Sequence, residues 1–251
     1  MLTLLAHLHS PPGGSIFASA TQGFVCRSAE ATIVAFAGTD PGVLQTVLTD
    51  FKTQHGVGTI HAGFAEALQA VWNQLAPQLQ APGPVRLLVT GHSLGAALAV
   101  LTAFRAHNEL RKDANFVYTF GLPRVGGGAF VAGYEPVYGA STFRFVNGDD
   151  PVPAVPPPEL GYQHVGRAFT CPHAGAFDPA AIPPAACNND PILARVETDF
   201  AGHTIDGLLR RRWTAPAQPG ILGWLYILLP GGLADHMQAR YLKALATPVP
   251  P

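Results

Sequence analysis

One short segment constrains the fold of this chain more than any other. A mostly apolar run, Val85–Thr90, leads directly into the pattern Gly-X-Ser-X-Gly, in which the glycines are Gly91 and Gly95 and the serine is Ser93. The next residues, Ala96–Leu101, have high helix propensity. This order predicts a strand, a sharp turn and a helix, with a serine nucleophile at the apex. The backbone at such an apex is strained by roughly 1–3 kcal/mol, and glycines on both sides prevent side-chain collisions.

The composition is that of a folded protein with a large core. Of 251 residues, 48% are hydrophobic and 12% are charged, and the formal net charge is −1. A nucleic-acid-binding protein needs a strong basic excess, which this chain lacks. No apolar run approaches the roughly 20 residues that span a bilayer, and the first ten residues lack the basic region of a signal peptide. We therefore expect a packed protein, consistent with an enzyme, that binds no nucleic acid and has no transmembrane segment.

Strand-like and helix-like segments alternate along the chain. Parallel strands joined by helical crossovers give an α/β fold, with a central mostly parallel sheet flanked by helices. No internal repeat divides the chain, and we predict a single domain over residues 1–251. The expected strands are 23–27, 31–36, 85–90, 116–120, 142–146 and 162–170. The expected helices are 43–51, 64–79, 94–110, a short one within 126–138, 203–212 and 234–246, and residues 151–158 are expected to form an ordered loop.

A serine nucleophile needs a histidine base, and the histidine needs a carboxylate that orients it. In the architecture that this strand, turn and helix predict, the acid and then the histidine follow the serine in the chain. Asp150 fits the acid position because it comes just after the strand 142–146 and a glycine turn, and before a stiff proline-rich loop. Asp149 is the neighbouring alternative. Only one of the two side chains can face the histidine, and we favour Asp150.

Four histidines follow Asp150 in the chain: His164, His173, His203 and His236. His164 lies within a predicted strand, and His203 lies at the start of a predicted helix, where a structural role is the commoner explanation. His236 follows a Pro-Gly-Gly turn and precedes an amphipathic helix near the end of the chain. This is the position expected for the base.

A serine that carries out acyl transfer also needs hydrogen-bond donors for the oxyanion that develops, and each donor contributes about 10²–10³ in rate. The Leu94 N–H directly follows the nucleophile and is the first predicted donor. The second is expected from the loop after an early strand. There Gly38 allows a sharp turn, and Thr39 offers both its N–H and its hydroxyl. The alternative for this loop is an ordinary strand-ending turn.

On these motifs the chain resembles the class 3, fungal-type triacylglycerol lipases, which have the α/β-hydrolase fold. The matching segments occur in the family's order across residues 23–245 and are Ala35–Asp40, His61–Phe64, Thr90–Leu98, Thr119–Gly126, Asn147–Pro153, Tyr162–Gly166, and Asp235–His236 with Tyr241. The resemblance implies a catalytic triad of Ser93, Asp150 and His236. It also implies an oxyanion hole formed by Thr39 and Leu94.

The predicted triad and the resemblance together indicate a serine hydrolase that cleaves carboxylic esters of lipids through an acyl-enzyme. Such a reaction needs no metal or organic cofactor, and the sequence contains no zinc-ligand, P-loop or dinucleotide-binding pattern. A short-chain esterase or a phospholipase with the same triad is the alternative enzyme. A lipid-binding or scaffold protein is the alternative without catalysis. The oligomeric state is left open.

The segment 41–51 follows the oxyanion loop, where the family has its lid. Leu44 and Val47 are the candidate substrate-binding residues in this segment. The chain departs from the family at two positions: Ala37 stands where the family usually has an arginine, and Val47 stands where it tends to have a tryptophan. These departures bear on the lid and on substrate choice rather than on the reaction type.

A second apolar stretch, residues 221–229, precedes the predicted histidine base. It is either a buried core element or an acyl-binding wall, and Trp224 and Leu225 are its candidate substrate-binding residues. Basic charge at Arg210–Arg212 nearby suits an anionic lipid surface. We therefore expect a lipid or ester substrate, bound at an oil–water or membrane interface.

The chain has three cysteines. Cys171 and Cys187 flank a loop rich in proline and alanine, and they either form a disulfide or remain thiols like Cys26. A disulfide would indicate an oxidising compartment. Together with the resemblance, this favours a secreted protein.

Overall fold

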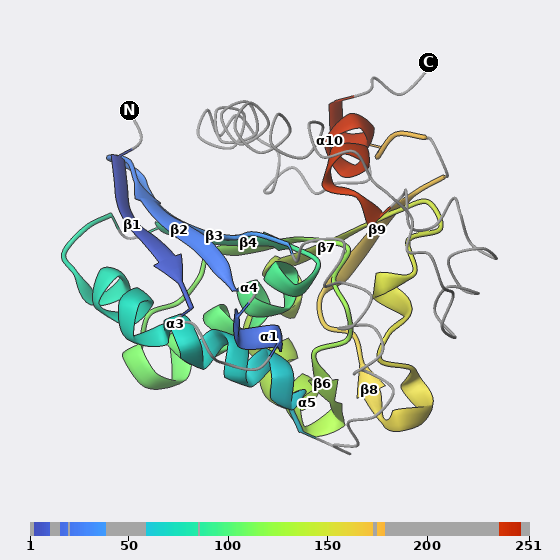
Figure 1. The fold of residues 1–251 in the computed structure, drawn as a ribbon, viewed down its shortest axis with the longest axis horizontal. Helices are drawn as coiled ribbons and strands as arrows, with labels where there is room; N and C mark the ends of the chain where they lie inside the picture. The colour runs from blue at the N-terminus through green and yellow to red at the C-terminus, as the bar shows by residue number, and fades with distance from the viewer. Residues whose placement is uncertain are drawn as a thin grey trace. The chain divides into compact units, whose positions relative to one another are not determined.

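A computed structural model describes residues 3–10, 16–19, 21–38, 59–84, 86–172, 175–178 and 236–246 (Figure 1). The chain divides into two compact units. The first comprises Met1–Val146 and Pro151–Ala168, and the second comprises Asn147–Asp150 and Phe169–Pro251. The predicted helices 43–51 and 203–212 lie outside the described residues.

The first unit is built on a mixed β-sheet whose strands lie in the order β1-β2-β3-β4-β5-β7 (Figure 1). The β1–β2 and β2–β3 pairs are antiparallel, and the pairs from β3 through β4 and β5 to β7 are parallel. All six residues of β3 are buried, as expected for a strand inside a parallel sheet. The strands are β1 (Thr3–His9), β2 (Gln22–Arg27), β3 (Ala31–Phe36), β4 (Arg86–His92), β5 (Phe116–Phe120) and β7 (Thr142–Asn147). The predicted α/β fold with a mostly parallel central sheet is confirmed.

Two long helices, α3 (Ala62–Gln80) and α4 (Leu94–Arg105), form the core together with the sheet. Helix α4 contacts β3, β4 and β5, and ten of its twelve residues are buried, since its small side chains let it lie close to the strands. Helix α3 contacts α4, β1 and the short helix α1 (Ile16–Ser19). It presents an apolar stripe whose members recur three or four residues apart, formed by Phe64, Leu68, Val71 and Leu75. Both predicted helices are confirmed, and α4 continues into a π-helical turn, Ala106–Leu110.

The predicted strand 162–170 is wrong in one respect, because the structure has two strands there. They are β8 (Tyr162–Gln163) and β9 (Arg167–Cys171). Gly166 separates them with a φ of +69°, a left-handed conformation that ends an extended strand and favours glycine. Strand β8 pairs instead with β6 (Gly126–Gly127) in a separate two-stranded sheet.

Strand β1 is not predicted by the sequence pattern. A bulge between Leu4 and Ala6 shifts its register against β2, and this shift breaks the simple alternation of buried and exposed residues on which the prediction of strands depends. From Ala6 onward the pairing with β2 is regular. The strand therefore places its side chains predictably only in its second half.

The segment 151–158 is an ordered loop, as its prolines predict. It contains a short 3-10 turn, Val152–Ala154. The Arg124 guanidinium donates hydrogen bonds to the carbonyl oxygens of Ala154 at 2.6 Å and Pro156 at 2.9 Å. Upstream of this loop, the predicted short helix is α5 (Gly128–Tyr138).

In the second unit, the loop Asn147–Asp150 belongs to the same compact body as helix α10 (Gln238–Ala246). Tyr241 and Ala244 are the most deeply buried of the residues described on this helix. The Phe177 N–H donates to the Ala244 carbonyl at 3.1 Å, and the Phe177 ring is stacked on that of Tyr241. The last predicted helix is thus confirmed.

His61 immediately precedes α3 and is fully buried. Its ring centroid lies 4.7 Å from that of Phe64, 5.4 Å from that of Phe17 and 6.0 Å from that of Tyr162. Burial lowers the pKa of His61 from 6.5 to about 4, because the charged imidazolium loses its hydration there.

We expect the free energy of unfolding to fall as the pH is lowered from 6.5 to about 4. In this window His61 takes up a proton in the unfolded chain but not in the folded one, so acid favours unfolding. A shift of this size corresponds to about 3 kcal/mol. Urea unfolding of the wild type and of His61→Gln at several pH values measures it, and the wild type should lose about 3 kcal/mol more than the variant. Identical pH dependence in both proteins would contradict this assignment.

Candidate active site

Ser93 occupies the turn between β4 and α4, as the motif predicts. Its φ of 58° and ψ of −125° lie in a region that residues other than glycine rarely adopt. The Ser93 N–H donates to the Phe120 carbonyl oxygen on the neighbouring strand β5 at 2.9 Å. This bond anchors the strained residue to the sheet, so the surrounding structure holds the conformation in place.

The two glycines of the motif are required by close backbone approaches. A Cβ atom at Gly91 would collide with the carbonyl group of Gly95. A Cβ atom at Gly95 would lie 2.6 Å from the Phe36 carbonyl oxygen at the end of β3 and would collide with that of Ala37. Larger residues at either position would therefore force the turn away from the sheet.

The Ser93 side chain lies at the start of helix α4, among groups that can stabilise negative charge. Ser93 is buried, and its hydroxyl makes no hydrogen bond within the part of the chain that the structure describes. The Leu94 N–H is the first of α4, so it has no acceptor inside the helix. The same helix end carries the positive end of the helix dipole. A developing oxyanion would find both a donor and a favourable field there.

The loop that follows β3 begins against the serine turn. A Cβ atom at Gly38 would lie 3.2 Å from the backbone oxygen of His92 and 2.5 Å from its ring. Only glycine therefore lets this loop run so close to the residue before the nucleophile. Thr39, the second predicted oxyanion donor, lies outside the described residues.

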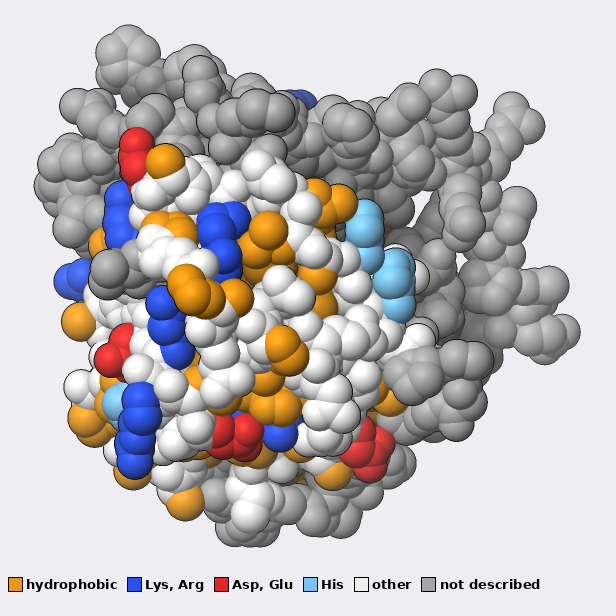
Figure 2. Space-filling model, turned by 90° about the vertical axis from the view of Figure 1, so that its left-hand side faces the viewer, with side chains coloured by type: hydrophobic (Ala, Val, Ile, Leu, Met, Phe, Trp, Pro, Cys, Tyr) orange, Lys and Arg blue, Asp and Glu red, His pale blue; other side chains and the backbone are white. Residues whose placement is uncertain are grey.

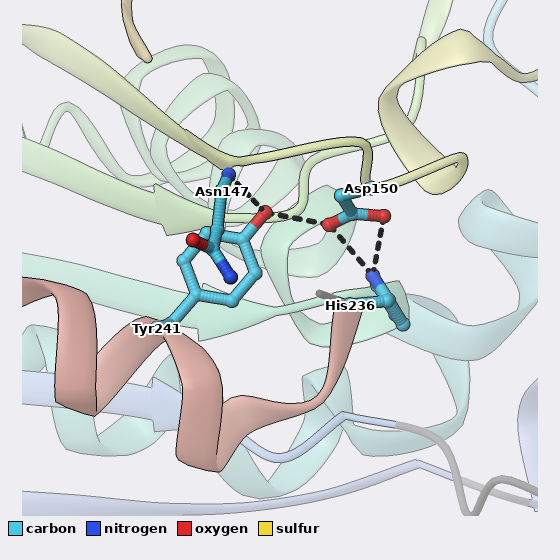
Figure 3. A network of polar contacts seen from close by, with 4 residues as sticks. All are labelled: Asn147, Asp150, His236 and Tyr241. Carbon is cyan, nitrogen blue, oxygen red and sulfur yellow. Dashed lines mark hydrogen bonds and ion pairs between the residues drawn. The ribbon is translucent and has the colours of Figure 1, made fainter. Parts of the chain in front are cut away.

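In the second unit, Asp150 and His236 form a buried pair (Figure 3). The Nδ1 atom of His236 lies 2.9 Å from each of the two Asp150 carboxylate oxygens. The exposed fraction of the side chain is 2% for His236 and 0% for Asp150. A carboxylate so placed selects the tautomer with a proton on Nδ1 and orients the ring.

Tyr241 and Asn147 complete a hydrogen-bond chain around the carboxylate (Figure 3). The Tyr241 hydroxyl donates to Asp150 Oδ2 at 2.5 Å and accepts from the Asn147 N–H at 3.1 Å. Burial and the negative charge of Asp150 raise the pKa of Tyr241 well above 10, so the phenol stays protonated and keeps donating. Sequence reasoning missed these two roles. Its only signal was the place of Tyr241 and Asn147 in the segments that resemble the family.

The alternatives to Asp150 and His236 lie in other surroundings. Asp149 is exposed. His164 has its Nε2 atom 2.8 Å from the Pro153 carbonyl oxygen, and burial together with the nearby charge of Arg144 lowers the pKa of His164 to about 3. His173 and His203 lie outside the described residues. Among the described residues, the structure thus brings His236 to Asp150, the pairing that chain order favours.

Cys171 supports the acid loop through two hydrogen bonds. Its Sγ atom donates to the Asn147 side-chain oxygen at 3.1 Å, and its carbonyl oxygen accepts the Gly148 N–H at 3.0 Å. Cys187, the other half of the predicted alternative disulfide, lies outside the described residues.

The remaining predicted positions lie outside the described residues: the lid segment 41–51 with Leu44 and Val47, and the stretch 221–229 with Trp224 and Leu225. Within the described ranges, no group of three or more His, Cys, Asp or Glu side chains is placed to hold a metal ion. The helices described there include none long and apolar enough to cross a membrane.

Comparison with known proteins finds similarity to lipases. A family model described as "Lipase (class 3)" matches residues 33–160. The secreted mono- and diacylglycerol lipase LIP4 of Malassezia restricta is 39% identical over 109 residues, which cover 42% of this chain and 36% of that protein. A lipase of Rhizomucor miehei is 37% identical over 117 residues, covering 44% and 32%. The chain therefore spans about a third of the length of these relatives.

A solved structure has a similar backbone. The crystal structure of a lipase from Rhizopus microsporus var. chinensis matches with a TM-score of 0.55 and 29% sequence identity. The match covers 67% of this chain and 61% of that chain. The match supports the same overall fold for the described part of this chain.

Proposed function

The chain belongs to the class 3 lipase family, and we propose that it is a serine hydrolase that cleaves carboxylic esters of lipids through an acyl-enzyme. Ser93 is the proposed nucleophile, His236 the general base, and Asp150 the carboxylate that orients the histidine. Leu94 and Thr39 are the proposed oxyanion donors. The observation that carries the proposal is the buried hydrogen-bonded pair of Asp150 and His236.

That pair supports catalysis because burying a carboxylate and an imidazole costs desolvation energy, and such buried titratable pairs are concentrated at functional sites. With Nδ1 of His236 facing Asp150, Nε2 is the nitrogen that would take the serine proton. The strained turn at Ser93 supports the other half of the proposal, since stored backbone strain is concentrated at functional sites.

The proposed reaction has two stages, formation of the acyl-enzyme and its hydrolysis. Ser93 Oγ attacks the ester carbonyl carbon while His236 takes the hydroxyl proton, and the oxyanion accepts hydrogen bonds from Leu94 and Thr39. When the tetrahedral intermediate collapses, the ester C–O bond breaks and the alcohol leaves with the proton from His236. A water molecule then attacks the acyl-enzyme in the same way and releases the carboxylic acid and free Ser93.

For the substrate we propose an acylglycerol bound at a lipid–water interface. The names of relatives as mono- and diacylglycerol lipases support this class, and their description as secreted supports an extracellular location. The segments 41–51 and 221–229, with Leu44 and Val47 in the first, are the proposed apolar contacts. A short-chain esterase remains the alternative enzyme.

The test is a panel of p-nitrophenyl esters from acetyl to oleoyl, assayed with and without an emulsified interface, together with labelling by a fluorophosphonate probe. We expect labelling of the wild type, and higher kcat/KM on long-chain esters when an interface is present. Absence of both labelling and turnover would leave a lipid-binding or scaffold protein. Labelling with activity confined to soluble short esters would make the protein an esterase.

Replacing Trp224 and Leu225 with alanine is expected to lower activity on emulsified long-chain esters much more than on soluble short-chain esters. The reason is that apolar side chains at an interface contribute through buried area, which short soluble substrates do not use. The ratio of the two activities in variant and wild type measures this effect. An equal loss on both substrates would mean that the stretch 221–229 has a structural role.

Replacing Tyr241 with phenylalanine is expected to lower kcat/KM by roughly 10- to 100-fold, since a hydrogen bond to a charged group contributes about 1.5–3 kcal/mol. The loss of a donor also raises the pKa of a buried carboxyl group. The acidic limb of the pH–rate profile should therefore move to higher pH, an effect that a purely structural role would not produce.

The matched control is Tyr138→Phe. Tyr138 also donates to an aspartate, Asp113, at 3.1 Å, but the Asp113 side chain is 67% exposed. This variant should keep the wild-type pH–rate profile. If both variants shifted the profile alike, Tyr241 would have no special part in orienting Asp150.

A further inference from the structure

Two histidines lie side by side on the outer face of the edge strand β1. Leu8 is fully buried in the core, and because side chains alternate along a strand, His7 and His9 point to the opposite, solvent-exposed face. Their ring centroids are 5.8 Å apart and their planes differ by 15°. Figure 2, which faces this side of the molecule, shows histidine side chains gathered at the surface in pale blue. None of the residues proposed for ester hydrolysis lies on this strand.

The backbone that carries the two histidines is held on both sides. On one side His7 pairs with Phe24 and His9 pairs with Gln22 in the ladder to β2. On the other side Gln74 of α3 clamps His9: its side-chain oxygen accepts the His9 N–H at 3.2 Å, and its amide donates to the His9 carbonyl at 2.7 Å. The backbone of the two histidines is therefore held in place, and only their side chains must become ordered before both can bind one ligand.

The ring separation suits a shared metal ion. With metal–nitrogen bonds of about 2.0–2.1 Å, the ring centroids of two imidazoles on one ion lie roughly 4.5–6 Å apart. The observed 5.8 Å falls in this range, and because the two rings are stacked with planes 15° apart, both exposed side chains must rotate to aim one nitrogen each at a common point. Neutral imidazole suits Cu²⁺, Ni²⁺ and Zn²⁺, and affinity for a given nitrogen site is highest for Cu²⁺.

We propose that His7 and His9 chelate one divalent transition-metal ion, with Cu²⁺ bound most tightly. Water molecules occupy the remaining coordination positions. The Gln22 side chain, exposed directly opposite His9 on β2, is within reach of these waters across the strand pair. Such a site would cross-link positions on one strand and leave the proposed hydrolase residues untouched.

The experiment is equilibrium dialysis of the full, untagged chain against CuCl₂, repeated with NiCl₂ and MnCl₂. The variants are His7→Gln, His9→Gln and the double variant. We expect the wild type to bind one Cu²⁺ more than the double variant at the same free concentration. Each single variant should weaken the affinity of that ion by about tenfold or more, because the second imidazole bond is intramolecular only when both rings are present. Ni²⁺ should follow the same pattern more weakly, and Mn²⁺ should not distinguish the proteins.

The control variant is His107→Gln. His107 is half-buried, and its Nδ1 atom is already bound to Asp113 at 2.6 Å, so its replacement should leave the additional Cu²⁺ in place. Circular dichroism verifies that all variants are folded, which is expected because the replaced rings lie on the surface. Equal Cu²⁺ binding by the wild type and the double variant overturns the proposal. So does a loss of the ion in His107→Gln that matches the loss in the His7 and His9 variants.

Discussion

Replacing Ser93 with alanine is expected to lower kcat for ester hydrolysis by about 10⁴- to 10⁶-fold. Without the hydroxyl no acyl-enzyme forms, and only binding and oxyanion stabilisation remain to assist attack by water. The fold should persist, since the Ser93 hydroxyl makes no hydrogen bond within the described part of the chain. Initial rates on p-nitrophenyl butyrate, fluorophosphonate labelling and the thermal unfolding midpoint measure activity, covalent reaction and stability separately.

The control for this variant is Ser141→Ala, at a serine in the turn after α5 whose hydroxyl donates to the Tyr138 carbonyl oxygen at 3.4 Å. It should retain near-wild-type activity and labelling. The double variant Ser93→Ala/His236→Ala should be little worse than either single variant, because residues of a triad act as a unit. Retention of more than about a hundredth of the wild-type kcat by Ser93→Ala would remove this serine from the mechanism.

Replacing Asp150 with asparagine is expected to lower kcat by about 10⁴-fold at neutral pH. An amide in this position presents an N–H₂ group to His236 Nδ1 and so favours the tautomer that cannot take the serine proton. It also cannot stabilise the imidazolium that forms during attack. The measurement is kcat across the pH range. The thermal unfolding midpoint checks that the variant still folds although a buried hydrogen-bonding group has been changed.

Asp149→Asn is the matched control, because it makes the same chemical change one residue away on an exposed side chain. It should leave kcat almost unchanged. The reverse result, with Asp149→Asn strongly impaired and Asp150→Asn near wild type, would transfer the role of the orienting acid to Asp149 and break the link to His236.

Local steric rules explain why parts of this fold are predictable. The turn at Ser93 needs Gly91 and Gly95, because Cβ atoms there would collide with backbone atoms a few residues away. The same rule makes the pattern visible in the sequence. The buried strand β3 and the apolar stripe of α3 are equally visible, since burial on a regular element leaves a period in the residues themselves.

Other elements were not predicted because the features that determine them leave no periodic pattern in the sequence. The break between β8 and β9 depends on the left-handed conformation of Gly166, and glycine is also common in ordinary turns. The edge strand β1 contains a bulge near Leu4, so its pattern slips by one residue. In both cases pairing with a neighbouring strand, rather than propensity, decides the local structure.

In the candidate site too, some features are determined by the sequence and others by tertiary packing. The sequence by itself determined the serine turn, the order of the proposed acid and base, and the family, because each depends on local geometry or on the order of segments along the chain. Only the tertiary structure decided that Asp150 and not Asp149 is buried against His236, 86 residues away, and that Tyr241 donates to the same carboxylate. The physical reason is that burial of a charge requires donors from distant segments. Which segments supply them depends on how the chain packs.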